Sequence, residues 1–438
     1  MPKAERGLNE LYRDDPERAD TLVFGRRGLL AGASLAAMGA AVGASIPFAS
    51  RMPAGLVPAA LAQAAPAGGP PAKPLSMPGK ANLVVLQDRP LVCETPEHWL
   101  DDEVTPTDKF FIRNNGGVPD VPADPKAWKI RVDGEVNTPL DLTVGELEQR
   151  FQPVTLKLQL ECGGNGRAGF QPEARGNQWG NGAIGCAEYT GVRLKDVLSA
   201  AGLKSSAVYT AHVGADPHLS GAPGQLSISR GVRLPKAMDE HTMIVLRMNG
   251  APLPHIHGGP VRLLVPGWPG SASQKWLTRI WIRDKEHDGP GMTGTSYRVT
   301  RKPMIPGSKV DDANMAILES MPVRSIITNV ANGAELAAGT RKLAVRGHAW
   351  AGDLEVSQVE VSVDYGATWK KAPLNAPANK YAWQRWSAEV DLPTDGYYEI
   401  WAKATDANGR SQPHVVGNWN PQGYGGNAFH RVAVLVKA

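Results

Sequence analysis

The sequence predicts two folded units, an α+β unit followed by an immunoglobulin-like β-sandwich. Three observations lead to this expectation. The chain has 438 residues, more than one ordinary domain usually contains. Its composition, 42% hydrophobic and 21% charged, is typical of a soluble globular protein with a sizeable core. The pattern of apolar residues also changes near residue 320, where short alternating strands replace a mixture of strands and helices.

The α+β unit is expected between residues 81 and 310. Thr143 and Glu146 stand at capping-box spacing and predict the start of a short helix. Apolar residues alternate with polar ones in VTLKLQLE, which is typical of a half-buried strand, and this strand runs into Cys162. The segment RLKDVLSAAGL predicts a helix that ends at Gly202, and VRLLVPGWPG predicts a buried strand. The absence of a βαβαβ rhythm and of G-x-G-x-x-G makes a Rossmann domain an unfavourable interpretation.

The β-sandwich is expected between residues 320 and 438. Val359, Val361 and Val363 alternate with polar residues, and five further segments show the same pattern between turn residues. Several short strands in about 120 residues fit an immunoglobulin-like sandwich. No Cys-Trp-Cys pattern occurs there, so an antibody-type disulfide is not expected.

The N-terminal 80 residues do not resemble a folded domain. Arg26 and Arg27 precede an uncharged, Ala/Gly-rich run, and ALAQAA provides a small-x-small site after Ala64. These features predict a twin-arginine-type export signal over residues 1–64, and hence a periplasmic enzyme. A retained membrane anchor is the alternative. Residues 65–80, rich in Pro and Ala, predict a linker.

Charge and cysteine content exclude several classes of function. The net charge is only +4, and basic and acidic residues are interspersed, so a nucleic-acid partner is not expected. Three scattered cysteines argue against a disulfide framework or a cysteine-rich zinc site, although Cys162 and Cys186 could still pair. No C-x-x-C-H motif is present, so we expect no haem attached to this chain.

Cys162 is the first candidate for chemistry. It ends a predicted strand and is followed by Gly163, Gly164 and, five residues on, Arg167. A thiolate is a soft metal ligand, glycines let a bulky ligand approach the backbone, and a nearby cation favours the thiolate. A buried, inert cysteine is the alternative explanation.

Two other segments carry groups suited to an anionic ligand. FFIRNN places Arg113 and Asn114 in a Gly/Pro-rich loop. His257, Arg262 and Lys275 surround a predicted strand bounded by Gly and Pro. Cationic side chains and backbone amides in loops are what a phosphate-bearing cofactor or an oxyanion requires, although each residue alone could form an ordinary surface salt bridge.

Taken together, these segments resemble the sulfite oxidase family of molybdenum enzymes. The likeness covers roughly residues 81–438, and FFIRNN, LECGGNGR, WGNGAIGCAEYTGVRLKDVL, MNGAPLPHIHGGPVRLLVPGWPGSASQKWL and AVRGHAW…VEVSVDYGATW follow the family's order. The resemblance implies a sulfite-oxidase-type molybdopterin core domain followed by an immunoglobulin-like dimerisation domain. It also implies a molybdenum–pyranopterin cofactor, a homodimer and oxidation of sulfite.

The resemblance assigns roles residue by residue. It implies that Cys162 ligates molybdenum and that Arg113 and Arg167 line an anion pocket. The remaining implied site residues are Tyr297 near the reacting centre, Trp179 in the pocket wall, and Asn114, His257, Arg262 and Lys275 at the pterin and its phosphate.

Two positions depart from the animal members of the family. Asn115 stands where they have histidine, and Gln422 stands where they have an arginine that adds positive charge to the substrate pocket. A cytochrome b5-like domain is also missing, so a separate c-type cytochrome is the expected electron acceptor. A sulfane dehydrogenase subunit of a thiosulfate-oxidising system is the alternative within the family. A peptide methionine sulfoxide reductase subunit and a non-enzymatic partner-binding protein are further alternatives.

Overall fold

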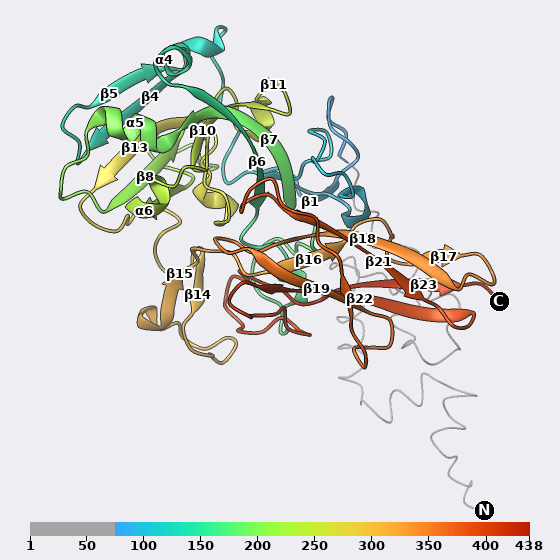
Figure 1. Ribbon diagram of the computed structural model, residues 1–438. Coiled ribbons are helices and arrows are strands. Elements are labelled where there is room, and N and C mark those ends of the chain that lie inside the picture. The colour runs from blue at the N-terminus through green and yellow to red at the C-terminus, as the bar shows by residue number, and fades with distance from the viewer. Residues whose placement is uncertain (1–74) are drawn as a thin grey trace, which may run out of the picture. The chain divides into compact units, whose positions relative to one another are not determined.

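The computed structural model describes residues 75–438 (Figure 1). The predicted export signal, residues 1–64, and the first part of the predicted linker lie outside the described residues. Among the residues that are described, no helix is both long and apolar enough to cross a membrane.

Two five-stranded sheets form the framework of the first half. The first has the order β11-β10-β7-β6, with β12 also paired to β10, and the second has the order β5-β4-β13-β8-β9. All pairs are antiparallel except β4 with β13. The first sheet comprises β6 (Pro153–Glu161), β7 (Ile184–Arg193), β10 (Met243–Met248), β11 (Ala251–Pro252) and β12 (Arg262–Leu264). The second comprises β4 (Lys129–Gly134), β5 (Leu140–Thr143), β8 (Tyr209–Gly214), β9 (Ser229–Arg233) and β13 (Leu277–Arg283).

The helices of the described residues are short. The α-helices are α4 (Val144–Arg150), α5 (Leu194–Ala201) and α6 (Leu234–Ala237). The Thr143–Glu146 capping box predicted for α4 is present, and α5 ends at Gly202 in a positive-φ conformation, as its sequence predicts. The 3₁₀ helices are η2 (Glu97–Trp99), η3 (Pro125–Ala127), η4 (Arg167–Gly169), η5 (His255–His257), η6 (Gly270–Ala272) and η7 (Asp312–Asn314).

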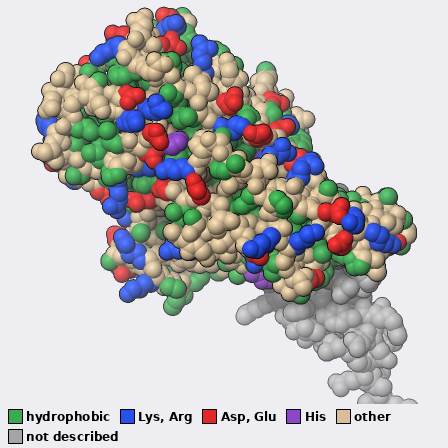
Figure 2. Space-filling model, in the orientation of Figure 1, with side chains coloured by type: hydrophobic (Ala, Val, Ile, Leu, Met, Phe, Trp, Pro, Cys, Tyr) green, Lys and Arg blue, Asp and Glu red, His purple; other side chains and the backbone are tan. Residues whose placement is uncertain are grey.

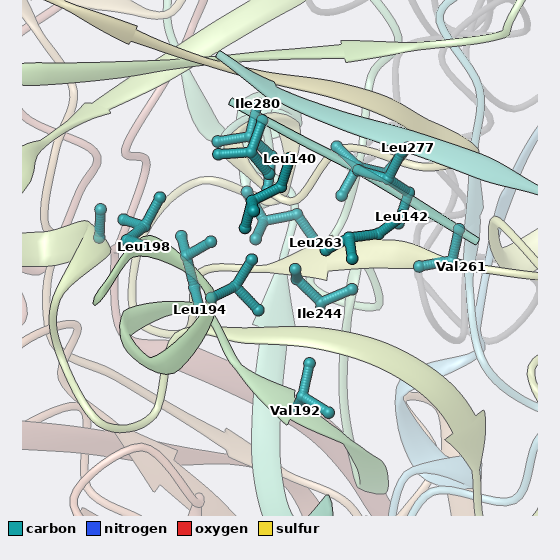
Figure 3. Close-up of a cluster of buried hydrophobic side chains, with 14 of the residues drawn as sticks. Leu140, Leu142, Val192, Leu194, Leu198, Ile244, Val261, Leu263, Leu277 and Ile280 are labelled. Carbon is teal, nitrogen blue, oxygen red and sulfur yellow. The ribbon is translucent and has the colours of Figure 1, made fainter. Parts of the chain in front are cut away.

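One hydrophobic core joins the two sheets and α5. Figure 3 shows Leu194 and Leu198 of α5 close to side chains from both sheets. The labelled sheet residues are Leu140, Leu142, Val192, Ile244, Val261, Leu263, Leu277 and Ile280, and all are buried. This core contains side chains of β12 and β13, whereas Leu158 and Leu160 of β6 lie with Cys162 in a second buried cluster. The candidate site is built on the ends of these three strands.

The C-terminal part is a β-sandwich, as the alternating pattern predicts. Its sheets have the orders β16-β18-β21 and β17-β23-β22-β19-β20. Val359 and Val361 of β19 are buried in the core between them. The strands are β16 (Arg324–Ile327), β17 (Ala334–Leu336), β18 (Lys342–Trp350), β19 (Val356–Ser362), β20 (Lys370–Ala372), β21 (Gln384–Asp391), β22 (Gly396–Asp406) and β23 (His430–Val436).

Two small sheets complete the described part. The first joins β1 (Val84–Gln87), β2 (Val92–Glu94) and β3 (Ile112–Arg113). The second pairs β14 (Arg298–Thr300) with β15 (Met315–Ile317) between the two larger halves of the chain. On the face shown in Figure 2, basic and acidic side chains are interspersed and do not gather into a stripe of one sign.

Buried polar contacts join the sandwich to the first half. Trp350 Nε1 of β18 donates to Glu161 Oε2 at 2.8 Å, and Arg324 Nε of β16 lies 3.6 Å from Glu161 Oε1. Both partners of this ion pair are 1% exposed. Because Glu161 is the last residue of β6, the sandwich contacts the side chain of the residue next to Cys162 directly.

Candidate active site

Cys162 lies immediately after β6, in a turn held by backbone hydrogen bonds. Its N–H donates to Ala183 O at 2.9 Å, and its carbonyl accepts from Asn165 N at 2.9 Å. The described cysteines are all free and buried, so the alternative pairing of Cys162 with Cys186 is not formed. Burial raises the pKa of the Cys162 thiol, and the charges of Arg113 and Arg167 oppose that rise. The thiol is therefore enclosed but lies within the field of two cations.

One cavity brings together most of the predicted site residues. It encloses about 650 Å³ of space, part of it open to solvent. Seven of the nine predicted residues line it: Arg113, Asn114, Cys162, His257, Arg262, Lys275 and Tyr297. They come from segments as distant as residues 113 and 297, which the two-sheet framework brings to one place.

Basic side chains gather in the cavity wall. Lys275 Nζ donates to Asn114 Oδ1 at 2.5 Å and to Ile256 O at 2.8 Å. Burial and the neighbouring cation Arg262 hold the pKa of Lys275 well below its usual range. His257 is buried, and both burial and the charge of Lys80 hold its pKa well below its usual value. An anion in the cavity would favour the protonated forms of these side chains, so the cluster suits an anionic ligand.

Arg262 takes part in this cluster mainly through its backbone contacts. It donates to His257 O at 2.9 Å and to Ser273 O at 2.8 Å, and it is 3% exposed. These bonds tie η5 to the loop after η6. Arg262 thus holds the two loops of the cavity wall together as well as contributing charge.

Arg167 and Trp179 are not among the residues that line the cavity. Arg167 Nε donates to Gln422 O at 2.7 Å and Nη1 to Asn177 O at 2.9 Å, so its guanidinium is engaged beside the Cys162 turn. Trp179 is fully buried and packs edge-on against Phe111, with ring centroids 6.1 Å apart. Because Phe111 lines the cavity, Trp179 supports the wall from behind it.

Tyr297 reaches the cavity from the segment before β14. Its hydroxyl donates to Asn115 Oδ1 at 3.3 Å, so Asn115, one of the two departures, lies beside it. Its ring stacks on Tyr424 with centroids 4.8 Å apart and an interplanar angle of 18°. Tyr424 comes from the C-terminal loop, and Gly425 N of that loop donates to Gly163 O at 3.0 Å. The C-terminal part therefore supplies one side of the Cys162 turn.

Sequence reasoning missed several residues of this region. Lys80 falls at the end of the predicted linker, yet its Nζ donates to Phe110 O at 2.7 Å and lies 3.1 Å from His257 Nε2. Burial lowers the pKa of Lys80 to about 8. Nothing in its Pro/Gly-rich surroundings indicates this contact. Tyr424 carries a weak signal, an aromatic residue within the glycine-rich segment QGYGGN.

The residues present fit a molybdopterin. Cys162 offers the soft sulfur ligand that a molybdenum centre requires, and the cations beside it suit a phosphate. Two buried polar atoms that line the cavity, Ser271 Oγ and Gln274 Oε1, have no hydrogen-bond partner among the described residues. Such atoms are normally satisfied in a folded protein, so they fit a polar ligand in this space.

Comparison with known proteins agrees with this chemistry. Residues 115–291 match the oxidoreductase molybdopterin binding domain, and residues 315–437 match the Mo-co oxidoreductase dimerisation domain. Sulfite oxidase of Gallus gallus is 34% identical over 83% of this chain and 79% of that protein. The mitochondrial sulfite oxidase of Mus musculus is 33% identical over 81% of this chain and 66% of that protein.

Two further proteins match most of this chain. A nitrate reductase of Hordeum vulgare is 32% identical, but this chain spans only 39% of it. The crystal structure of the sulfane dehydrogenase SoxCD from Paracoccus pantotrophus superposes with a TM-score of 0.65 and 25% identity, over 83% of this chain and 88% of that chain. The matched families and the cavity chemistry agree that molybdopterin is the cofactor. The chain therefore belongs to the sulfite oxidase family of molybdopterin oxidoreductases.

Proposed function

We propose that this protein is a periplasmic sulfite dehydrogenase, which oxidises sulfite to sulfate and passes the electrons singly to an external c-type cytochrome. One observation carries the proposal: the Cys162 thiol opens on the same cavity as Arg113, His257 and Lys275. A soft ligand beside a cluster of cations suits a metal that acts on a small, highly charged anion. The similarity to sulfite oxidases supports sulfite as that anion.

The residues have separable roles in this proposal. Cys162 would hold the metal through its sulfur, and His257, Arg262 and Lys275 would hold the pterin and its phosphate. Asn114, which accepts from Lys275, would fix the position of that ammonium group. The cofactor, when bound, supplies oxygen-atom transfer and takes up two electrons.

The chain's own contribution to the reaction is electrostatic. Sulfite and water give sulfate, two protons and two electrons. The substrate is an anion, so the site must offset the repulsion between this anion and other negative charge in the cavity. Arg113 lines the cavity and offsets that repulsion, and Arg167 adds charge from behind the Cys162 turn. Tyr297 also lines the cavity, and its hydroxyl, which donates to Asn115 Oδ1 in this structure, would turn to donate to the anion.

Turnover of free sulfite tests the substrate. We expect purified protein from a pterin-competent host to reduce an artificial acceptor, and then a c-type cytochrome, when sulfite is added. Absence of turnover in protein that contains molybdenum would contradict the proposal. In a Cys162→Ser variant we expect pterin to be retained while turnover is lost, because His257, Arg262 and Lys275 remain. Turnover retained by this variant would show that Cys162 is not the ligand.

A sulfane dehydrogenase is the second candidate function. The structural similarity to SoxCD favours it, and so does Gln422, whose neutral side chain stands where the animal enzymes have an arginine. Protein that contains molybdenum, leaves free sulfite unchanged and oxidises a protein-bound sulfane group would identify this activity.

Export and assembly complete the proposal. The Arg26–Arg27 pair and the following uncharged run support a twin-arginine route, which carries folded, cofactor-loaded proteins. The match to a dimerisation domain supports a homodimer formed through residues 315–437. Fractionation of the host and light scattering of the purified protein test these two points separately.

A further inference from the structure

Arg230 is a buried arginine that has no part in the roles described above. It lies on β9 and is 0% exposed. Nη1 donates to Gly291 O at 2.5 Å, whereas Nε and Nη2 have no hydrogen-bond partner among the described residues. A buried guanidinium is costly to leave without partners, so its position needs a reason.

Arg230 belongs to a column of four side chains beside the Cys162 turn. Its Cζ lies 4.8 Å from the ring centroid of Tyr297. Tyr297 stacks on Tyr424, and Arg167 Cζ lies 5.2 Å from the ring centroid of Tyr424. Two guanidinium groups therefore enclose a pair of stacked tyrosines, with every separation inside the range of cation–π and aromatic stacking interactions.

The column of side chains packs against the turn that contains Cys162. A side-chain carbon added at Gly163 would touch both tyrosine rings at 3.6 Å, so the pair packs against the residue that follows Cys162. Tyr297 lines the cavity and carries a positive φ of 50°, a conformation that a bulky residue adopts only when its surroundings impose it. The stacking partners supply that constraint.

The loop that contains Gln422 helps to explain why a cation is present at position 230. It lies two residues before Tyr424, its carbonyl accepts from Arg167, and its side chain donates to Thr295 Oγ1 at 3.2 Å. This loop thus brings no charge of its own to the column. Arg230, two residues after the cavity-lining Ile228, places a positive charge against the opposite face of Tyr297.

We infer that Arg230 is a positioning and specificity-determining residue, which holds the Tyr297 hydroxyl toward the cavity and supplies positive charge for binding a tetrahedral or pyramidal oxyanion. This inference deepens the proposed function and rests on it. Arg230 acts through Tyr297, so its effect must depend on the tyrosine hydroxyl. A residue needed only for folding would show no such dependence.

The test measures binding of inorganic sulfate to holoenzyme by calorimetry, which does not require turnover, together with KM and kcat for sulfite. For Arg230→Gln we expect sulfate affinity to fall about tenfold and KM for sulfite to rise similarly, with a smaller effect on kcat, as loss of one charge-assisted contact predicts. Arg230→Lys keeps the charge and should recover part of the affinity. In a Tyr297→Phe background, Arg230→Gln should have at most about half its effect.

The matched control is Arg233→Gln on the same strand. Arg233 is exposed and pairs with Glu319 at 2.6 Å, so sulfate affinity should stay within about twofold of the wild-type value. Unchanged sulfate affinity in folded Arg230→Gln protein would overturn the inference, as would full additivity with Tyr297→Phe. If Arg230→Gln does not fold, the inference is tested instead with Arg230→Lys and with Tyr424→Leu, which removes the ring that stacks on Tyr297. Sulfate affinity and KM for sulfite are measured for both variants. Wild-type protein that binds sulfate but leaves sulfite unchanged would contradict the proposed function, and a loss of sulfate affinity in Arg230→Gln would then still support the role of Arg230.

Discussion

Replacing Arg324 with methionine should uncouple the β-sandwich from the Cys162 turn. Arg324 donates to Asn165 O at 2.8 Å and to Asn181 Oδ1 at 2.5 Å, and it also donates to Gly426 O. Its Nε faces Glu161 at 3.6 Å in a site where both side chains are 1% exposed. Burial raises the pKa of Glu161 and lowers that of Arg324, and each charge opposes the shift of the other.

The expected loss of unfolding free energy depends on which partners Glu161 retains. In Arg324→Met the carboxylate retains the donors Asn165 Nδ2 at 2.9 Å and Trp350 Nε1 at 2.8 Å, but it loses the only cation that pairs with it among the described residues. Breaking one side of a buried ion pair costs about 3–5 kcal/mol of unfolding free energy. For a chain of this size that corresponds to a fall of roughly 3–7 °C in Tm.

The assay compares variants by thermal and urea unfolding of purified protein at neutral pH. Arg346→Met is the matched control, since Arg346 pairs with Asp101 at 2.5 Å on the surface of the same sheet and should contribute less than about 1 kcal/mol. Adding Glu161→Gln to Arg324→Met should restore at least about 1 kcal/mol, because it removes the unpaired charge. A loss no larger than that of Arg346→Met, or no recovery in the double variant, would refute the reasoning.

Three further predictions follow from single side chains. Lys275→Met should leave the Tm of the cofactor-free chain unchanged or raised, because it removes a buried amine whose pKa burial holds well below its usual range, while pterin retained on purification should fall at least about tenfold. Arg167→Gln should raise KM for sulfite and flatten its dependence on ionic strength, and an unchanged KM would show that its charge does not act on the substrate. His348 stacks on Trp383, and burial lowers its pKa to about 4. As the pH falls below 6.5, the unfolded chain therefore binds a proton at His348 that the folded chain does not bind. His348→Phe should therefore gain about 2–3 kcal/mol of stability relative to wild type between pH 6.5 and 4, measured by urea unfolding, and a constant difference would contradict this assignment.

Local pattern was enough to predict the elements that carry the site. The capping box at Thr143, the helix ended by Gly202 and the alternating strand before Cys162 are all present. Each depends on neighbours within about four residues, and helix and strand periodicity report that range directly. The resemblance to a known family then predicted which of the chemistry-bearing residues meet, and seven of the nine line one cavity.

Sequence patterns did not predict the contacts between segments that are distant along the chain. Lys80 stands in a Pro/Gly-rich stretch that predicts a linker, yet it lies 3.1 Å from His257, 177 residues later. Trp179 and Arg167 were expected at the pocket and lie beside or behind it, because Phe111 and the Cys162 turn occupy the wall. Their distance from the cavity depends on how the side chains between them pack.

The sequence by itself determined the order of the α+β unit and the sandwich, the strand that ends at Cys162, and the supply of cations for an anionic cofactor. Only the tertiary structure decided that Arg230 and Tyr424 enclose Tyr297, and that Arg324 of the sandwich pairs with the residue beside Cys162. The physical reason is the range of the interactions. Periodicity and capping are local, whereas stacking and buried ion pairs form between segments that only the packed sheets bring together.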